Sequence, residues 1–138
     1  MPDKHLSSQF DSELNSISAR VMEMGGLVES QIRQAVHALS QFSLEAVDSV
    51  VAIEARVNAM EVEIDQELSS IIARRQPTAR DLRLLMAFSK ATANLERMGD
   101  EAHKMARMVR SIIESGATRS LPSSDLRMAA DLASGLLR

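Results

Sequence analysis

Apolar residues recur in steps of three and four along three long stretches of this chain, and this spacing constrains its fold more than any other feature. On an α-helix, such steps place the apolar side chains on one face. The three stripes run over residues 10–39, 50–71 and 84–112. An isolated helix cannot bury its stripe, so the three helices must pack against one another. We therefore predict an all-α protein.

Polar and turn-forming residues mark where the helices begin and end. Ser43 can cap a helix that follows it, and Arg74 and Arg75 suit the C-terminal end of that helix. Pro77 suits the first position of the next one. The predicted helices cover residues 6–41, 44–75 and 78–115. Because their connections are short, neighbouring helices must run antiparallel, which gives an antiparallel three-helix bundle.

A further apolar pattern begins after Pro122 and continues to Arg138 without a stop signal. We interpret this pattern as a fourth helix that starts near residue 123 and is truncated by the end of the chain. The sequence therefore predicts two parts, a three-helix bundle over residues 1–118 and a linker with the truncated helix over residues 119–138.

Composition excludes several classes of protein. The absence of cysteine excludes disulfides, thiolate metal sites and thiol nucleophiles. With three Phe and no Tyr or Trp, the chain has little on which nucleic-acid bases could stack. No apolar stretch approaches the roughly 18 residues that a transmembrane helix needs, and no signal peptide precedes the first helix. We expect a cytoplasmic protein with no transmembrane segment that binds no nucleic acid.

Paired carboxylates are the clearest candidates for a binding site. Glu96 and Asp100 are four residues apart on the third helix, where they are expected to face solvent opposite the apolar stripe. Two such carboxylates repel each other on a bare helix, and a bound cation would reverse that effect. On the second helix, Glu54, Asn58 and Glu61 form an oxygen-rich line. If the chain folds back near residue 76, Glu54 and Asn58 lie level with Glu96.

Two interpretations of these lines remain open. Oxygen ligands from two adjacent helices would form a site for a hard cation. Alternatively, the arginines of the third helix neutralise the second helix directly. The charges permit this, since residues 1–67 carry 12 acidic and 4 basic side chains while residues 68–138 carry 7 acidic and 12 basic ones.

The histidines add little to this picture. His103 shares a face with Glu96 and Asp100 and could add a nitrogen ligand. His37 is expected to be exposed on the first helix, and no residues that would support phosphotransfer surround it. Because no nucleophile, base and orienting group can be assembled, we expect that the protein is not an enzyme.

Four segments of the chain resemble the PhoU family. The two most specific are residues 72–83 (IARRQPTARDLR) and residues 95–102 (LERMGDEA). Residues 24–29 (MGGLVE) and 57–61 (VNAME) also look like family positions. The resemblance runs in order along almost the whole chain.

The resemblance implies a fold of two homologous three-helix bundles, of which this chain would hold the first and the start of the second. It also implies surface-bound divalent or trivalent metal ions (iron, zinc or manganese) on a Glu/Asp-x-x-x-Asp signature, which Glu96 and Asp100 match. Glu54, Asn58 and Glu61 look like the partnering positions. Asn94 departs from the pattern, because many relatives have Asp there.

In function, the resemblance implies a regulatory adaptor of bacterial phosphate signalling. Such a protein would couple the ATPase of a phosphate-specific ABC transporter to a sensor histidine kinase and repress the phosphate-starvation response. It would lie in the cytoplasm, peripheral to the inner membrane through its partners. From the residues themselves we expect a homodimer, because the apolar stripe of the truncated helix lacks partners and would associate through residues 122–138. The alternative is a metal-binding or phosphotransfer helical bundle unrelated to phosphate uptake.

Overall fold

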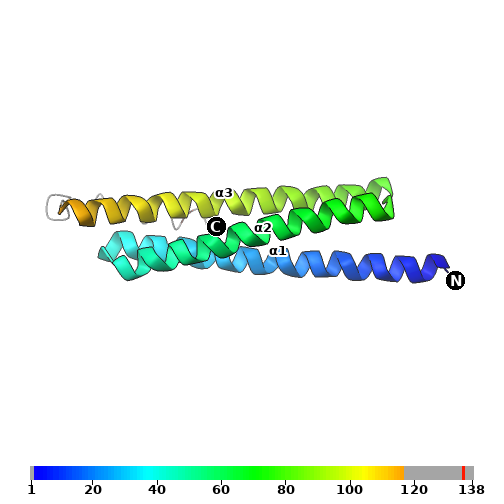
Figure 1. The fold of residues 1–138 in the computed structure, drawn as a ribbon, viewed down its shortest axis with the longest axis horizontal. Helices are drawn as coiled ribbons and strands as arrows, with labels where there is room; N and C mark the ends of the chain where they lie inside the picture. The colour runs from blue at the N-terminus through cyan, green and yellow to red at the C-terminus, as the bar shows by residue number, and fades with distance from the viewer. Residues whose placement is uncertain (1, 117–134, 136–138) are drawn as a thin grey trace.

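Three long helices lie side by side in a rod, and the chain reverses direction at each connection (Figure 1). The computed structural model describes residues 2–116 and residue 135, with side chains from residue 8 onward. The helices are α1 (Pro2–Gln41), α2 (Leu44–Arg75) and α3 (Ala79–Ser115). The predicted antiparallel three-helix bundle is confirmed. The predicted fourth helix and the linker over residues 119–138 fall outside the described residues.

A short connection joins α1 to α2 and is stabilised as the sequence predicts. The Ser43 hydroxyl accepts a hydrogen bond from the backbone N–H of Ala46 at 3.1 Å and so caps α2. Phe42 adopts a left-handed conformation with φ of 50°. This reversal lets α2 begin within two residues of the end of α1.

The start of α3 differs from the prediction. Pro77 is not the first helical residue, because the helix begins at Ala79 and Thr78 is its N-cap. The Thr78 hydroxyl accepts a hydrogen bond from the backbone N–H of Asp81 at 3.3 Å. A proline side chain has no such acceptor, so it precedes the cap instead of replacing it. The start of α1 also differs, at Pro2 instead of residue 6.

The core lies along the common axis of the three helices. In α1 and α2 the buried residues follow the predicted stripes, as Met24, Val28, Val57 and Ile64 illustrate. In α3 the predicted positions Ala102 and Val109 are buried, but the buried face also includes a neighbouring row of residues that the prediction left out. Leu84, predicted to be inside, is 43% exposed. The buried positions of α3 that recur every seventh residue are Leu85, Thr92, Gly99 and Ala106.

Ion pairs along the outside of the bundle join mainly α1 and α2. Arg20 of α1 pairs with Glu67 of α2 at 3.2 Å, and Arg75 of α2 pairs with Glu13 of α1 at 2.8 Å. No helix in the described part of the chain is long and apolar enough to cross a membrane.

Candidate metal centre

Glu96 and Asp100 lie at the edge of the α3 face that packs against α2. Both are half-buried, whereas Asn94 and Arg97 beside them are exposed. The expectation that the two carboxylates face solvent opposite the apolar stripe is therefore wrong. The cause is that the buried face of α3 extends to Thr92 and Gly99, which lie on the side of the helix next to these carboxylates.

Two carboxylates of α2 lie opposite this pair. Glu54 is 7% exposed and its carboxyl is within hydrogen-bonding reach of the Asp100 carboxyl. Glu61 is half-buried. Among the acidic side chains around it, Glu96 repels its charge most strongly. The predicted register is wrong by about one turn, because Glu54 lies level with Asp100 and not with Glu96. We refer to Glu54, Glu61, Glu96 and Asp100 as the carboxylate cluster.

The cluster concentrates negative charge, and the acidities of its members reflect this. Burial raises the pKa of Glu54 above its ordinary value of 4.5, and the Asp100 carboxyl raises it further, although a hydrogen bond from Gln31 acts in the opposite direction. Burial and the negative charge of Glu96 raise the pKa of Glu61. Burial and the neighbouring Asp100 raise the pKa of Glu96.

No arginine or lysine in the described residues forms an ion pair with any member of the cluster. Arg97 instead donates to Asn94 within α3, at 2.6 Å. The ion pair between α3 and α2 is that of Arg110 with Asp48, near the far end of α2. The interpretation in which the arginines of α3 neutralise these carboxylates is therefore wrong for this site.

The donor set fits a hard cation in its chemistry, because all four members supply carboxylate oxygens and none is neutralised by a basic side chain. The side chains are not gathered into a ready-made cage. Among the described residues, no three carboxylate or imidazole groups converge on one point. An ion bound here would therefore draw the side chains inward from α2 and α3.

The two remaining predicted donors differ in position. His103 is half-buried and close enough to Glu54 for its charge to favour the ionised carboxylate. Asn58 is exposed, and no hydrogen bond in the described structure joins its amide to the cluster. The structure thus places four of the five predicted ligands along the facing sides of α2 and α3 and leaves Asn58 exposed.

A buried side chain that the sequence analysis missed contacts the cluster from α1. Gln31 is completely buried, and its amide Nε2 donates to the Glu54 carboxylate. The missed signal is the spacing of Met24, Val28, Gln31 and Ala35, in which a polar residue occupies a core position of the stripe.

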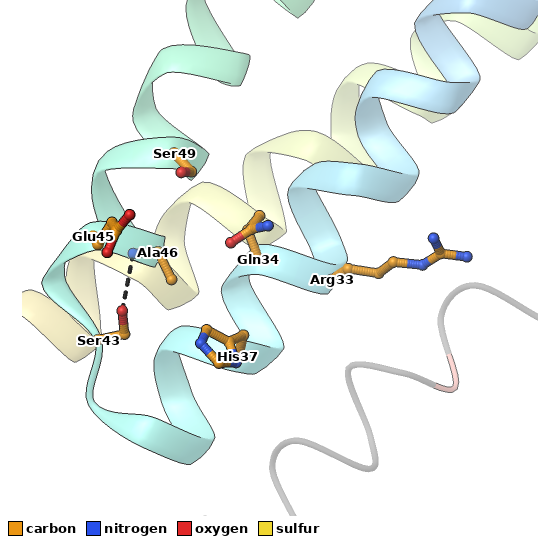
Figure 2. A pocket seen from close by; sticks show the side chains of 7 residues that line it. All are labelled: Arg33, Gln34, His37, Ser43, Glu45, Ala46 and Ser49. Carbon is orange, nitrogen blue, oxygen red and sulfur yellow. Dashed lines mark hydrogen bonds between the residues drawn. The ribbon is translucent and has the colours of Figure 1, made fainter.

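An open hollow lies on the surface at the connection between α1 and α2 (Figure 2). His37 and Glu45 line it, while the Arg33 side chain extends away from it and pairs with Glu29. Within the described residues, no side chain makes a hydrogen bond to the His37 ring.

Comparison with known proteins places this geometry in a family. The model of the PhoU domain matches residues 21–109, which include Gln31 and the whole carboxylate cluster. The chain belongs to the PhoU family. The match explains why the segments around Arg75 and Gly99 resemble PhoU sequences, and it includes the whole of α2 and parts of α1 and α3.

Relatives of known name agree with the family assignment. The chain is 49% identical over 138 residues to a PhoU homologue from Burkholderia sp, described as a phosphate-specific transport system accessory protein, covering 99% of this chain and 59% of the relative. It is 49% identical over 105 residues to the PhoU accessory protein of Escherichia coli (strain K12), covering 76% and 44%. The crystal structure of PhoU from Pseudomonas aeruginosa superposes with a TM-score of 0.80 at 39% identity, covering 88% of this chain and 58% of that one. This PhoU-family chain therefore spans about half the length of these relatives.

Proposed function

We propose that this chain acts in a bacterial phosphate-specific transport system as a regulatory adaptor. It would couple the ATPase of the phosphate ABC transporter to a sensor histidine kinase and help to repress the phosphate-starvation response. The observation that carries the proposal is the 49% identity, over the whole chain, to a protein named as an accessory of phosphate-specific transport. The proposed location is the cytoplasmic side of the inner membrane, with a homodimer as the assembly.

An adaptor needs surface that its own fold leaves free, and the outer face of α3 provides it. Basic residues recur there at every seventh position, and all are exposed: Arg83, Lys90, Arg97 and Lys104. Exposed apolar side chains lie on the same helix, with Leu82 at 38%, Met86 at 60% and Met108 at 46%. Mixed cationic and apolar surface of this kind suits docking of an acidic protein partner.

A role without catalysis agrees with the chemistry of the described residues. The buried polar side chains of the described residues are Gln31, Glu54 and Thr92. None of them is a nucleophile paired with a base. The Thr92 hydroxyl donates to the carbonyl oxygen of Phe88 in its own helix at 2.8 Å. The relatives are likewise described as accessory proteins.

The second part of the proposal is metal binding at the carboxylate cluster. Glu54 and Glu61 from α2 and Glu96 and Asp100 from α3 would supply oxygen ligands to iron, zinc or manganese. Burial, and then repulsion between neighbouring carboxylates, raise the pKa values of Glu61 and Glu96, and an ion there would offset both effects. Because the ligands come from two helices, binding would also tie α2 to α3.

Affinity capture tests the adaptor proposal. Lysates of phosphate-fed and phosphate-starved cells would be passed over the immobilised chain, and we expect recovery of the transporter ATPase or the sensor kinase. The double variant Arg83→Glu, Lys90→Glu should lose this capture while keeping its helical content, because both side chains are exposed on the outer face of α3.

The matched control is Arg33→Glu, which makes the same kind of charge change on the exposed face of α1. Equal loss of capture in the control would contradict the assignment of the α3 face. Failure of the unchanged chain to retain either partner would contradict the adaptor proposal itself.

A further inference from the structure

A polar side chain occupies the middle of the apolar core where the three helices meet. Gln31 of α1 is completely buried among residues such as Val28 and Ile32. Its Nε2 atom donates to the Glu54 carboxylate Oε2 of α2, and it also lies 3.4 Å from the carbonyl oxygen of Val50. Gln31 therefore connects the core to the carboxylate cluster.

The third helix is shaped to accept this amide. A Cβ atom added at Gly99 of α3 would lie 2.8 Å from Gln31 Oε1 and 3.6 Å from Glu54 Oε2. Real Cβ atoms do not approach an oxygen as closely as 2.8 Å, so any other residue at position 99 must displace the Gln31 side chain. Gly99 also lies directly before Asp100, so the point at which α3 contacts the Gln31 amide and the carboxylate cluster lie on the same turn of α3.

Gln31 does not contribute to stability as an apolar residue would. Its Oε1 atom is buried with no hydrogen-bond partner in the described residues. A buried polar atom without a partner destabilises the folded state. Methionine has a similar length and would fill the same space without this cost. Stability alone therefore gives no reason for an amide at position 31.

We propose that Gln31 is a positioning residue for the carboxylate cluster. Its amide holds the Glu54 carboxylate at the edge of the core, directed toward Asp100, and Gly99 leaves the space in which the amide sits. This inference rests on the proposed metal binding. It adds a residue from α1 to a site whose ligands come from α2 and α3.

Positioning of this kind affects affinity through entropy and geometry. A glutamate side chain has several rotatable bonds, and without the Gln31 hydrogen bond the Glu54 carboxylate can turn away from Asp100. An ion would then have to immobilise the side chain on binding, which weakens the affinity. Residues that orient metal ligands typically change metal affinity by about 10- to 100-fold when they are substituted.

Titration with Mn²⁺ tests the proposal, with free ion measured by electron paramagnetic resonance and unfolding measured separately in chelator. We expect Gln31→Met to bind Mn²⁺ at least about tenfold more weakly than the unchanged chain, while it keeps its helical fold in chelator. The control is Leu39→Met, a volume-conserving change at another buried position of α1, which should leave Mn²⁺ affinity unaltered.

Two further variants show whether Gln31 acts through Glu54. In the Glu54→Gln background, Gln31→Met should have no additional effect on Mn²⁺ affinity. Gly99→Ala displaces the amide from the other side, so it should weaken Mn²⁺ binding in the otherwise unchanged chain and not in the Gln31→Met background. Gly99→Ala also keeps the test available if Gln31→Met fails to fold.

The outcomes separate this inference from the proposal on which it rests. If the unchanged chain binds Mn²⁺ and both Gln31→Met and Gly99→Ala bind it equally well, the positioning role is overturned and metal binding stands. If the unchanged chain binds neither Mn²⁺, Fe²⁺ nor Zn²⁺, metal binding and the positioning role are both overturned.

Discussion

The Arg75 guanidinium at the end of α2 contacts both oxygens of the Glu13 carboxylate in α1. Its Nη2 donates to Oε1 at 2.8 Å, and its Nε lies 3.4 Å from Oε2. Arg74 adds a further contact to Oε1 at 3.3 Å. The hydrogen bond from Arg75 is the main reason that the pKa of Glu13 lies below its ordinary value of 4.5. The paired arginines thus fasten the end of α2 to α1.

This pair predicts a pH-dependent contribution to stability. Because the pKa of Glu13 is lower in the folded state, its contribution is complete above the unfolded pKa and is lost as the pH falls through the folded pKa. We expect Glu13→Gln to lower the melting temperature at pH 7, and we expect the difference from the unchanged chain to shrink as the pH falls through the folded pKa. A difference that persists undiminished in acid would contradict this assignment. Circular dichroism during thermal unfolding gives the melting temperatures of the variant and of the unchanged chain at each pH.

The cap of α2 predicts a loss of stability on removal of one hydroxyl. Ser43→Ala removes the acceptor for the Ala46 N–H and should lower the free energy of unfolding by about 1 kcal/mol. Ser40→Ala is the matched control, because the Ser40 hydroxyl donates to the carbonyl oxygen of His37 in its own helix and caps no helix start. Urea denaturation of the two variants should therefore give different midpoints. Equal midpoints would show that the cap contributes little.

Two helical glycines predict effects of opposite direction. Gly26 has open space where a Cβ would be, so Gly26→Ala should raise the free energy of unfolding by up to about 1 kcal/mol. Gly99→Ala gains the same helical propensity, but the added methyl group meets the buried Gln31 amide. We expect it to be less stable than Gly26→Ala by about 1–3 kcal/mol, the usual effect of overpacking a core. Equal stability of the two in urea denaturation would mean that the amide moves aside freely.

The carboxylate cluster predicts metal-dependent stability. A ligand that binds only the folded chain stabilises it by about 2.7 kcal/mol at a hundredfold excess over the dissociation constant. We expect the chain to melt at a higher temperature in the presence of Mn²⁺, iron or Zn²⁺. The double variant Glu96→Ala, Asp100→Ala should show no such increase. Glu63→Ala with Glu67→Ala removes two carboxylates of the same spacing outside the cluster and serves as the control. An equal increase in both double variants would contradict the site.

In the absence of metal, the cluster predicts that removal of one charge is favourable. Burial and the charge of Glu96 raise the pKa of Glu61, so folding disfavours its ionised form at pH 7. In chelator, Glu61→Gln should therefore melt above the unchanged chain, and added Mn²⁺ should reduce or reverse the difference. Differential scanning calorimetry with and without Mn²⁺ provides the comparison. A lower melting temperature for the variant in chelator would contradict the electrostatic account.

The sequence predicts the helices well because their ends and stripes are local properties. Ser43 as a cap, the end of α1 at Gln41 and the end of α2 at Arg75 all agree with the structure. The predicted start of α3 is wrong because it favours Pro77 over the cap signal of Thr78 and Asp81, three residues apart. The errors at the starts of α1 and α3 leave the architecture unchanged.

The orientation of α3 cannot be predicted from hydrophobicity alone. Its innermost positions include Thr92 and Gly99, which an apolar pattern omits, so the predicted stripe leaves out part of the buried face. That omission leads to the wrong environment for Glu96 and Asp100. The register of α2 against α3, and the burial of Gln31, depend on contacts between residues far apart in sequence. A single sequence does not contain that information, even though its charge pattern predicts that carboxylates of the second and third helices face each other.

The buried amide also determines how the helices align lengthwise. Apolar stripes that repeat every seven residues can in principle slide past one another by seven residues and still bury their side chains. Such a slip of α3 would bring Thr92 or Ala106 against Gln31, and each has a Cβ where Gly99 has none. A slip of α2 in one direction would place Val47 against the amide and remove its carboxylate acceptor. One glutamine in the core therefore disfavours several alignments that hydrophobic burial alone would permit.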